Sequence, residues 1–163
     1  MEKRDLYDEN KILTGETIFK GELIPIGRYY ITVIVFIQNS KGEFLLQKRV
    51  QKKDGKWATT GGHPVSGETS MQGIITEINE ELGINVNNDN IKLFKTIKTE
   101  DDFVDLYYLK EDINIKNIVV QKEEVDKVKW SSIDEIKEMI EKGYFSNSHA
   151  EFFEYCLEFL HSK

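Results

Sequence analysis

The residues with the clearest potential for chemistry are three glutamates on one short segment, Glu77, Glu80 and Glu81. Their i, i+3 and i+4 spacing places the side chains on one face of a helix. Like charges at this spacing repel each other by only roughly 0.2–0.5 kcal/mol per pair, so a solvated acidic face is one interpretation. The other is a metal site, because Mg²⁺ prefers carboxylate, carbonyl and water oxygens.

A glycine-rich segment and a fourth carboxylate come before these glutamates. Gly61, Gly62 and Gly67 allow the chain to pass close to the helix, and the backbone carbonyl of Gly61 can act as a hard oxygen ligand. Glu68 lies just ahead of the helix. This combination favours a metal site over a purely solvated acidic face.

The element that must hold the carboxylates is a helix over residues 69–82. Thr69 and Gln72 match the capping box of a helix N-terminus, and Gly83 stands where a C-terminal glycine belongs. An apolar stripe at helical spacing predicts the face that packs on the core. Its members are Met71, Ile74, Ile75, Ile78 and Leu82.

The rest of the chain predicts a sheet covered by helices. Residues 4–20 are expected to be extended and to double back near residues 10–15, and residues 50–56 read as a charged loop. Predicted strands are 29–38, 44–49, 91–98, 103–109 and 125–130, and further helices are 132–142 and 148–161. This mixture indicates an α/β or α+β layered fold.

With 163 residues and no repeat or linker, we expect a single domain over residues 1–163, with 1–27 as an N-terminal extended hairpin.

Composition limits the possible partners. The net charge is −7 and no block of five basic residues occurs, so nucleic-acid binding is not expected, whereas a phosphorylated small molecule can bind through a bridging metal. No apolar run approaches the ~18 residues of a membrane span, and the N-terminus lacks a signal peptide pattern. With Cys156 as the only cysteine, these features predict a cytoplasmic protein without a membrane partner. A homodimer through the last helix or the N-terminal segment is possible.

Residues 62–84 resemble the Nudix box, a pattern of Gly, five residues, Glu, seven residues, then Arg-Glu-apolar-x-Glu-Glu-x-Gly-apolar. Only the arginine is missing, and Thr76 stands in its place. The matching positions are Gly62, Glu68, Glu77, Ile78, Glu80, Glu81, Gly83 and Ile84. The similarity extends over roughly residues 28–142, and it implies the Nudix α/β/α sandwich around a mixed β-sheet.

The resemblance implies Mg²⁺-dependent (or Mn²⁺-dependent) hydrolysis of a nucleoside diphosphate linked to another group X. It makes Glu81 the leading metal ligand. Glu77 would bind metal or orient the attacking water, and Glu80 would be a further ligand. The Gly61 carbonyl would complete the metal shell.

Residues outside the box have less defined roles. Glu124, or its neighbour Glu123, is a candidate extra ligand or base, with a solvated strand-edge charge as the alternative. Arg49 can grip a phosphate with its planar fork, or be an ordinary exposed arginine. Trp57 can stack on a base, or pack in the core. His63 is expected to bond the loop backbone rather than a metal.

Residues 5–10 with Thr14-Gly15 resemble a subgroup that includes isopentenyl-diphosphate isomerases. Those isomerases are expected to use a cysteine beside Gly-His-Pro, where this chain has Gly61, and Cys156 falls in an apolar helix as an expected inert thiol. Isomerase activity is therefore disfavoured. Thr76 cannot offset the negative charge of the glutamates as arginine would. A second alternative to the hydrolase is therefore a weakly active domain that senses nucleotides.

Overall fold

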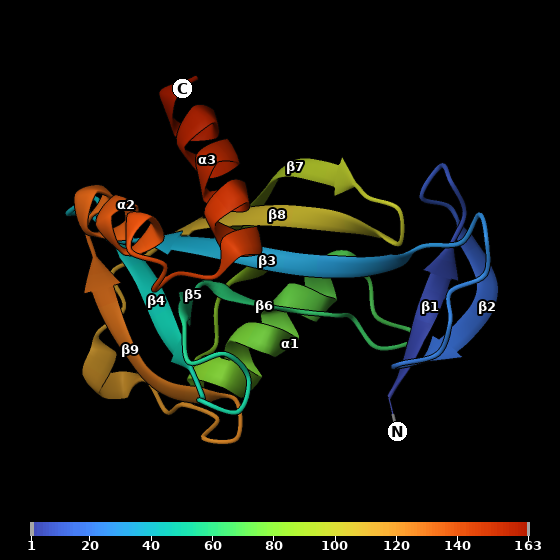
Figure 1. Ribbon diagram of the computed structural model, residues 1–163, viewed down its shortest axis with the longest axis horizontal. Helices are drawn as coiled ribbons and strands as arrows, with labels where there is room; N and C mark the ends of the chain where they lie inside the picture. The colour runs from blue at the N-terminus through green and yellow to red at the C-terminus, as the bar shows by residue number, and fades with distance from the viewer. Residues whose placement is uncertain (1, 163) are drawn as a thin grey trace.

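The computed structural model describes residues 2–162, and its centre is a mixed seven-stranded sheet (Figure 1). The strands are β3 (Tyr30–Gln38), β4 (Phe44–Arg49), β5 (Trp57–Ala58), β6 (Thr60–Gly62), β7 (Ile91–Lys98), β8 (Asp102–Lys110) and β9 (Val125–Ser131). β3 pairs in parallel with β8, whose other edge pairs antiparallel with β7. β6 pairs antiparallel with β3, while β5 and β9 pair antiparallel with β4.

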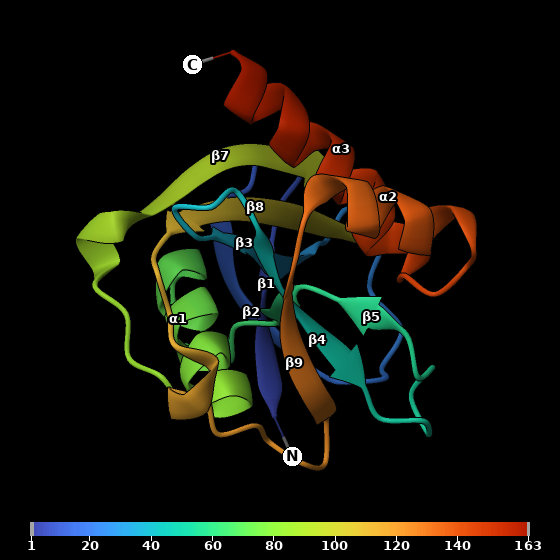
Figure 2. The same cartoon turned by 90° about the vertical axis from the view of Figure 1, so that its left-hand side faces the viewer.

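Helices cover both faces of this sheet, as Figures 1 and 2 show. α1 (Ser70–Leu82) lies against one face, and α2 (Ile133–Glu141) and α3 (Asn147–His161) lie against the other. Two short 3-10 helices, Asn88–Asn90 and Ile115–Asn117, lie in connections between these elements. The predicted α/β/α sandwich with a mixed sheet is confirmed.

Each face of the sheet has its own apolar core, because alternate residues of β3 point to opposite sides. Val33 and Val35 pack with Ile74 and Ile78 beneath α1. Ile34 and Phe36 belong to the core beneath α2 and α3, which also contains Ile136, Phe153 and Cys156. The buried cysteine in this second core agrees with the inert thiol expected from the sequence, and burial raises its pKa to about 12.

The helix of the carboxylates begins and ends where the sequence predicts. Thr69 accepts a hydrogen bond from the Gln72 amide, and the Gln72 side chain bonds the Thr69 amide in return. Gly83 adopts a left-handed conformation (φ 65°) and its amide bonds Asn79. Both ends of α1 are thus fixed locally, before any tertiary contact is considered.

An N-terminal hairpin, β1 (Lys3–Tyr7) and β2 (Leu13–Phe19), lies at the end of the sheet and contacts the loop ahead of α1 (Figure 1). The Asp5 carboxylate accepts hydrogen bonds from the Ser66 hydroxyl (2.6 Å) and the Gly67 amide (2.9 Å). At the hairpin tip, Lys11 forms an ion pair of 2.6 Å with Asp105, a fully buried residue of β8. The hairpin therefore braces the loop that leads into the box helix.

None of the helices formed by the described residues is long and apolar enough to cross a membrane.

Candidate active site

A charged cleft of about 510 Å³ opens between α1, the start of the hairpin and the loops that follow β4 and precede β9. Its acidic lining residues are Glu2, Glu77, Glu80, Glu81 and Glu124. Its basic lining residues are Arg4, Lys20, Arg49 and Lys53. The cleft therefore brings together all the predicted carboxylate ligands, with Gly61 and Arg49, although they are distant in the sequence.

Glu81 is the most firmly held of these carboxylates, and only 8% of it is exposed. Its Oε1 accepts a hydrogen bond of 3.0 Å from Gln47 Nε2, and Gln47 is oriented by the Thr60 hydroxyl, which donates to its amide oxygen at 2.9 Å. The Gly61 amide also donates to Glu81. Burial raises the pKa of Glu81, while the Gln47 bond and the nearby cations Lys53 and Arg49 oppose this rise. Its orientation is fixed before any ligand binds.

Glu77 has a strongly perturbed acidity. Burial, followed by the charges of Glu81 and Glu80, raises the pKa of Glu77 to about 8. A methyl group on Gly62 would overlap the Glu77 carboxylate, so β6 and α1 approach each other here as closely as glycine permits. This region of the cleft favours the uptake of positive charge, whether a proton or a cation.

The backbone of Gly61 also faces the carboxylates. In two antiparallel strands, the paired residues alternate. One pair exchanges two backbone hydrogen bonds, and the next pair exchanges none. Because the Gly61 amide bonds Glu81 on α1, this amide does not donate a hydrogen bond to Ile34, the residue of β3 that pairs with Gly61. The Gly61 carbonyl would then point to the same side of β6 as its amide, and its role as an oxygen ligand stays a prediction.

These oxygen donors suit a hard divalent cation, whose charge would offset the repulsion that raises the pKa of Glu77. Within residues 2–162, no three His, Cys, Asp or Glu side chains are gathered closely enough to form a complete ligand set. The carboxylates thus surround the cleft without enclosing a finished site. To enclose a cation, at least one of the less restrained side chains, such as exposed Glu80, would have to rotate.

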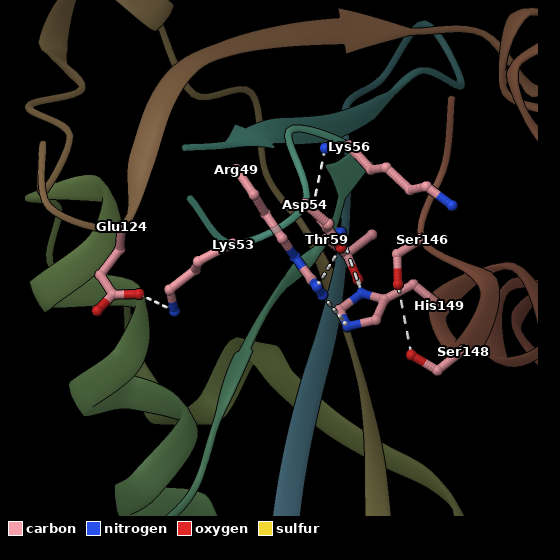
Figure 3. A network of polar contacts seen from close by, with 9 residues as sticks. All are labelled: Arg49, Lys53, Asp54, Lys56, Thr59, Glu124, Ser146, Ser148 and His149. Atoms are coloured by element: carbon pink, nitrogen blue, oxygen red, sulfur yellow. Dashed lines mark hydrogen bonds and ion pairs between the residues drawn. The ribbon is translucent and has the colours of Figure 1, made fainter. Parts of the chain in front are cut away.

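Glu124 reaches the same cleft from the start of β9, where it forms an ion pair with Lys53 of the loop after β4 (Figure 3). Its neighbour Glu123 is exposed and is not part of the cleft lining. Between the two candidates that the sequence left open, the geometry favours Glu124.

Arg49, at the end of β4, is held from two directions at the edge of the cleft (Figure 3). Its Nη1 donates to Asp54 Oδ2 at 3.0 Å, and its Nη2 lies 3.2 Å from His149 Nε2. Its charge also acts on Glu81. The guanidinium is therefore a fixed cation beside the leading carboxylate, well placed to contact an anion.

Trp57 and His63 occupy different surroundings. Trp57 is half-buried on β5, packs against the core beneath α2 and α3, and has the Lys129 ammonium 4.3 Å from its ring centroid. It does not contribute to the cleft lining. His63 does line the cleft, and its Nδ1 lies 3.3 Å from the carbonyl of Ile31 on β3, so the backbone that it contacts is that of a strand and not of the expected loop.

Thr76, the departure from the box pattern, makes one specific contact. Its hydroxyl donates to Glu68 Oε2 at 2.7 Å, and Glu68 Oε1 accepts from the Val65 amide at 2.9 Å. Thr76 therefore helps to hold the loop ahead of α1, but it supplies no positive charge to the cluster.

Gln47, Thr59 and His149 were not predicted as site residues. Gln47 occurs within the apolar strand Phe44–Arg49, and a buried polar residue in such a strand is a signal that sequence reasoning can use. His149 stands at the start of the last helix, 100 residues from its partner Arg49. No local pattern in the sequence links those two positions.

A family model, described as the NUDIX domain, matches residues 28–156. The chain belongs to the Nudix family. An uncharacterised Nudix hydrolase of Listeria monocytogenes is 33% identical over 150 residues, which span 89% of this chain and 88% of that protein. An isopentenyl-diphosphate Delta-isomerase of Pectobacterium atrosepticum is 35% identical, but over only 48% of this chain and 46% of that protein. The resemblance to the isomerase subgroup is therefore partial.

Solved Nudix structures share this fold at low identity. DR0079 from Deinococcus radiodurans superposes with a TM-score of 0.78 at 20% identity, covering 95% of this chain and 99% of that one. A bifunctional NMN adenylyltransferase/ADP ribose pyrophosphatase from Francisella tularensis, complexed with AMP and a Mn ion, has a TM-score of 0.63 at 21% identity. That match covers 85% of this chain and 43% of the other.

Proposed function

We propose that this Nudix protein hydrolyses the diphosphate linkage of a nucleoside diphosphate derivative, with Mg²⁺ or Mn²⁺ as cofactor. The main observation in support is that Glu77, Glu81 and Arg49 face one cleft, which pairs ligands for a cation with a cation for a phosphate. The Francisella tularensis protein, named an ADP ribose pyrophosphatase and bound to AMP and Mn, is consistent with this substrate class.

In this proposal the carboxylates divide the work. Glu81, held by Gln47 and Gly61, is the leading ligand, with Glu80 and the Gly61 carbonyl as further ligands. When bound, the divalent ion would neutralise the diphosphate and lower the pKa of a coordinated water. Glu77 would bind the metal or accept the proton of the attacking water.

The remaining residues bind and orient the substrate. Arg49 donates to a phosphate oxygen, which places phosphorus in line with the water, since positioning and charge stabilisation account for most of phosphoryl-transfer catalysis. Glu124, which pairs with Lys53 here, would be available to hold the metal or the water. Water oxygen then bonds to phosphorus, the bridging P–O bond breaks, and the leaving phosphate oxygen takes up a proton.

A second candidate is a ligand sensor that binds nucleotide with little turnover. Two observations favour it: Thr76 adds no charge to the acidic cluster, and Glu124 is already neutralised by Lys53. An isomerase reaction is disfavoured, because Gly61 occupies the position where a cysteine would be needed and Cys156 is buried in the core beneath α3.

The deciding experiment measures phosphate release from nucleoside diphosphates, sugar nucleotides and dinucleoside polyphosphates with Mg²⁺ or Mn²⁺. Glu81→Gln should abolish turnover, whereas Glu154→Gln, an exposed change on α3, should not. Tight nucleotide binding without turnover in the unaltered protein would overturn the hydrolase in favour of the sensor.

A stability measurement adds a readout that does not depend on knowing the substrate. In chelator at pH 8, Glu77→Gln should raise the melting temperature, because it removes a partly buried charge that repels Glu81. The same variant should lose most of the stabilisation that Mn²⁺ gives the unaltered protein. Unchanged stabilisation by Mn²⁺ would contradict the role of Glu77 as a ligand.

A further inference from the structure

The most unusual polar group outside the carboxylate cluster is His149, a buried histidine at the start of α3 (Figure 3). Only 7% of it is exposed, and both of its ring nitrogens have polar neighbours. Nδ1 lies 2.8 Å from the Thr59 hydroxyl, and the Thr59 amide N–H points at it as a donor from 3.2 Å. Nε2 lies 3.2 Å from Nη2 of Arg49. His149 thus connects α3 to a residue at the edge of the cleft on β4.

The chemistry of these neighbours decides where the ring carries its proton. Burial and the charge of Arg49 lower the pKa of His149 to about 3, so the ring is neutral and has one N–H and one acceptor nitrogen. Arg49 can only donate, so Nε2 must accept and the proton must lie on Nδ1. The Thr59 hydroxyl then accepts from Nδ1, and the Thr59 amide N–H, which points at the same nitrogen, loses it as an acceptor. The charged donor prevails because charge-assisted hydrogen bonds are roughly twice as strong as neutral ones.

The Arg49 guanidinium is consequently held by hydrogen bonds on two sides. His149 accepts from Nη2 and Asp54 accepts from Nη1, which restrains the plane of the guanidinium at the edge of the cleft. A guanidinium has five N–H groups, and further ones are available to a ligand beyond these two contacts. Because planar, two-point contacts with phosphate depend on orientation, a misdirected guanidinium loses affinity even though its charge remains.

We propose that His149, whose Nε2 accepts from Arg49 and whose Nδ1 proton is accepted by the Thr59 hydroxyl, is a positioning residue that aims Arg49 at a phosphate of the substrate. The proposal rests on the proposed function for the identity of that ligand. It assigns α3, a helix of the opposite layer from α1, a role in substrate binding. It also gives Thr59 a role, because its hydroxyl oxygen accepts the Nδ1 proton of the tautomer that Arg49 requires.

The first test is binding of inorganic pyrophosphate by calorimetry, in chelator and again with Mg²⁺, which requires no turnover. His149→Phe keeps a ring but removes the acceptor. It should raise the Kd for pyrophosphate about 10-fold, because the Arg49 guanidinium would lose its orientation toward the phosphate. His149→Gln, whose amide oxygen can reach the place of Nε2, should bind within about 3-fold of the unaltered protein, roughly half the free-energy change of a 10-fold loss. In an Arg49→Ala background, His149→Phe should cause no further loss.

The second test separates a positioning role from a merely structural one. Thr59→Val removes the hydroxyl acceptor and should weaken pyrophosphate binding, whereas Thr59→Ser keeps the hydroxyl and should not. This pair remains informative if His149→Phe does not fold. ¹⁵N NMR should assign the neutral ring of His149 as the Nδ1–H tautomer. If hydrolysis is found, His149→Phe should raise KM and change kcat little.

Several outcomes would overturn the proposal. They are an Nε2–H tautomer, pyrophosphate binding by folded His149→Phe that equals the unaltered protein, or equal losses from His149→Phe with and without Arg49. A chain that binds pyrophosphate as predicted but hydrolyses nothing would instead reject the proposed function and leave the positioning role standing.

Discussion

Thr76 donates its hydroxyl hydrogen to Glu68 and thereby holds the loop ahead of the box helix, but it leaves the acidic cluster without a cation. Thr76→Arg would place a guanidinium near Glu77 and Glu80, where opposite charge stabilises the ionised carboxylates. We expect about 10-fold tighter Mn²⁺ binding or a similar gain in turnover, the effect of ~1.4 kcal/mol. Thr76→Val, which has the same shape without the hydroxyl, is the control. No gain in either quantity with Thr76→Arg would refute the prediction.

Gly62 and Gly73 offer a matched pair, since a methyl group at either position meets a neighbour closely. At Gly62 the neighbour is the mobile end of Glu77, whereas at Gly73 it is the rigid ring of Pro64. Gly62→Ala should therefore weaken metal binding with a stability change below ~1 kcal/mol, and Gly73→Ala should destabilise by about 1–3 kcal/mol. Urea unfolding and Mn²⁺ titration of both variants measure the contrast. Equal stability losses would show that both glycines serve packing alone.

Single side chains divide into those that sequence reasoning identified and those it missed. The box glutamates were identified because their spacing is local and places them on one helix face. Gln47 and His149 were missed because their partners Glu81 and Arg49 lie 34 and 100 residues away in the chain. The roles assigned to all these residues remain predictions until the variants are measured.

At the scale of elements, the caps explain why α1 was predicted almost to the residue. Thr69, Gln72 and Gly83 fix both ends of the helix through contacts within a few residues. The strands β5 and β6 were missed because they are only two and three residues long, and their hydrogen bonds depend on β4 and β3. Residues 61 and 62, expected in a loop, belong to β6, but their close approach to the helix was anticipated correctly.

The attachment of the N-terminal hairpin gives a prediction at this scale. Asp105 is fully buried and accepts hydrogen bonds from Lys11 (2.6 Å), Thr96 (2.6 Å) and Ser70 (2.5 Å). Lys11→Met would leave a buried carboxylate without its cation. Because the Lys11 side chain is 30% exposed, we expect a moderate loss of about 1–3 kcal/mol.

Urea denaturation of Lys11→Met measures that loss, with Lys92→Met on the exposed face of β7 as the control. The control should stay within about 0.5 kcal/mol of the unaltered protein. If both lysine variants behave alike, the ion pair with Asp105 contributes nothing measurable to the attachment of the hairpin.

At the scale of the whole molecule, His149 gives folding stability a dependence on acid. Its folded pKa of about 3 lies below the ordinary value of 6.5, owing to burial and then to Arg49, partly opposed by Asp54. The unfolded chain therefore binds a proton that the folded chain does not. Stability from this group is complete above pH 6.5 and is lost as pH falls from 6.5 toward 3.

We expect the unaltered protein to lose about 2–3 kcal/mol more than His149→Gln between pH 7 and pH 4.5. Taking the difference between the two proteins cancels other titrating groups, including Glu77, whose raised pKa acts in the opposite direction. His161→Gln, on an exposed ring, serves as the control. Parallel pH profiles for the unaltered protein and His149→Gln would contradict the prediction.

The position of Glu2 has a practical consequence. Glu2 lines the cleft, so any sequence joined ahead of it begins at the mouth of the candidate active site. A polyhistidine purification tag placed there would bring metal-chelating imidazoles next to carboxylates proposed to bind metal. The far end of α3 points away from the sheet on the side opposite α1 (Figure 1). The tag should therefore be placed after α3, or be removed when it is N-terminal. Its imidazoles then cannot compete for the metal in the titrations described above.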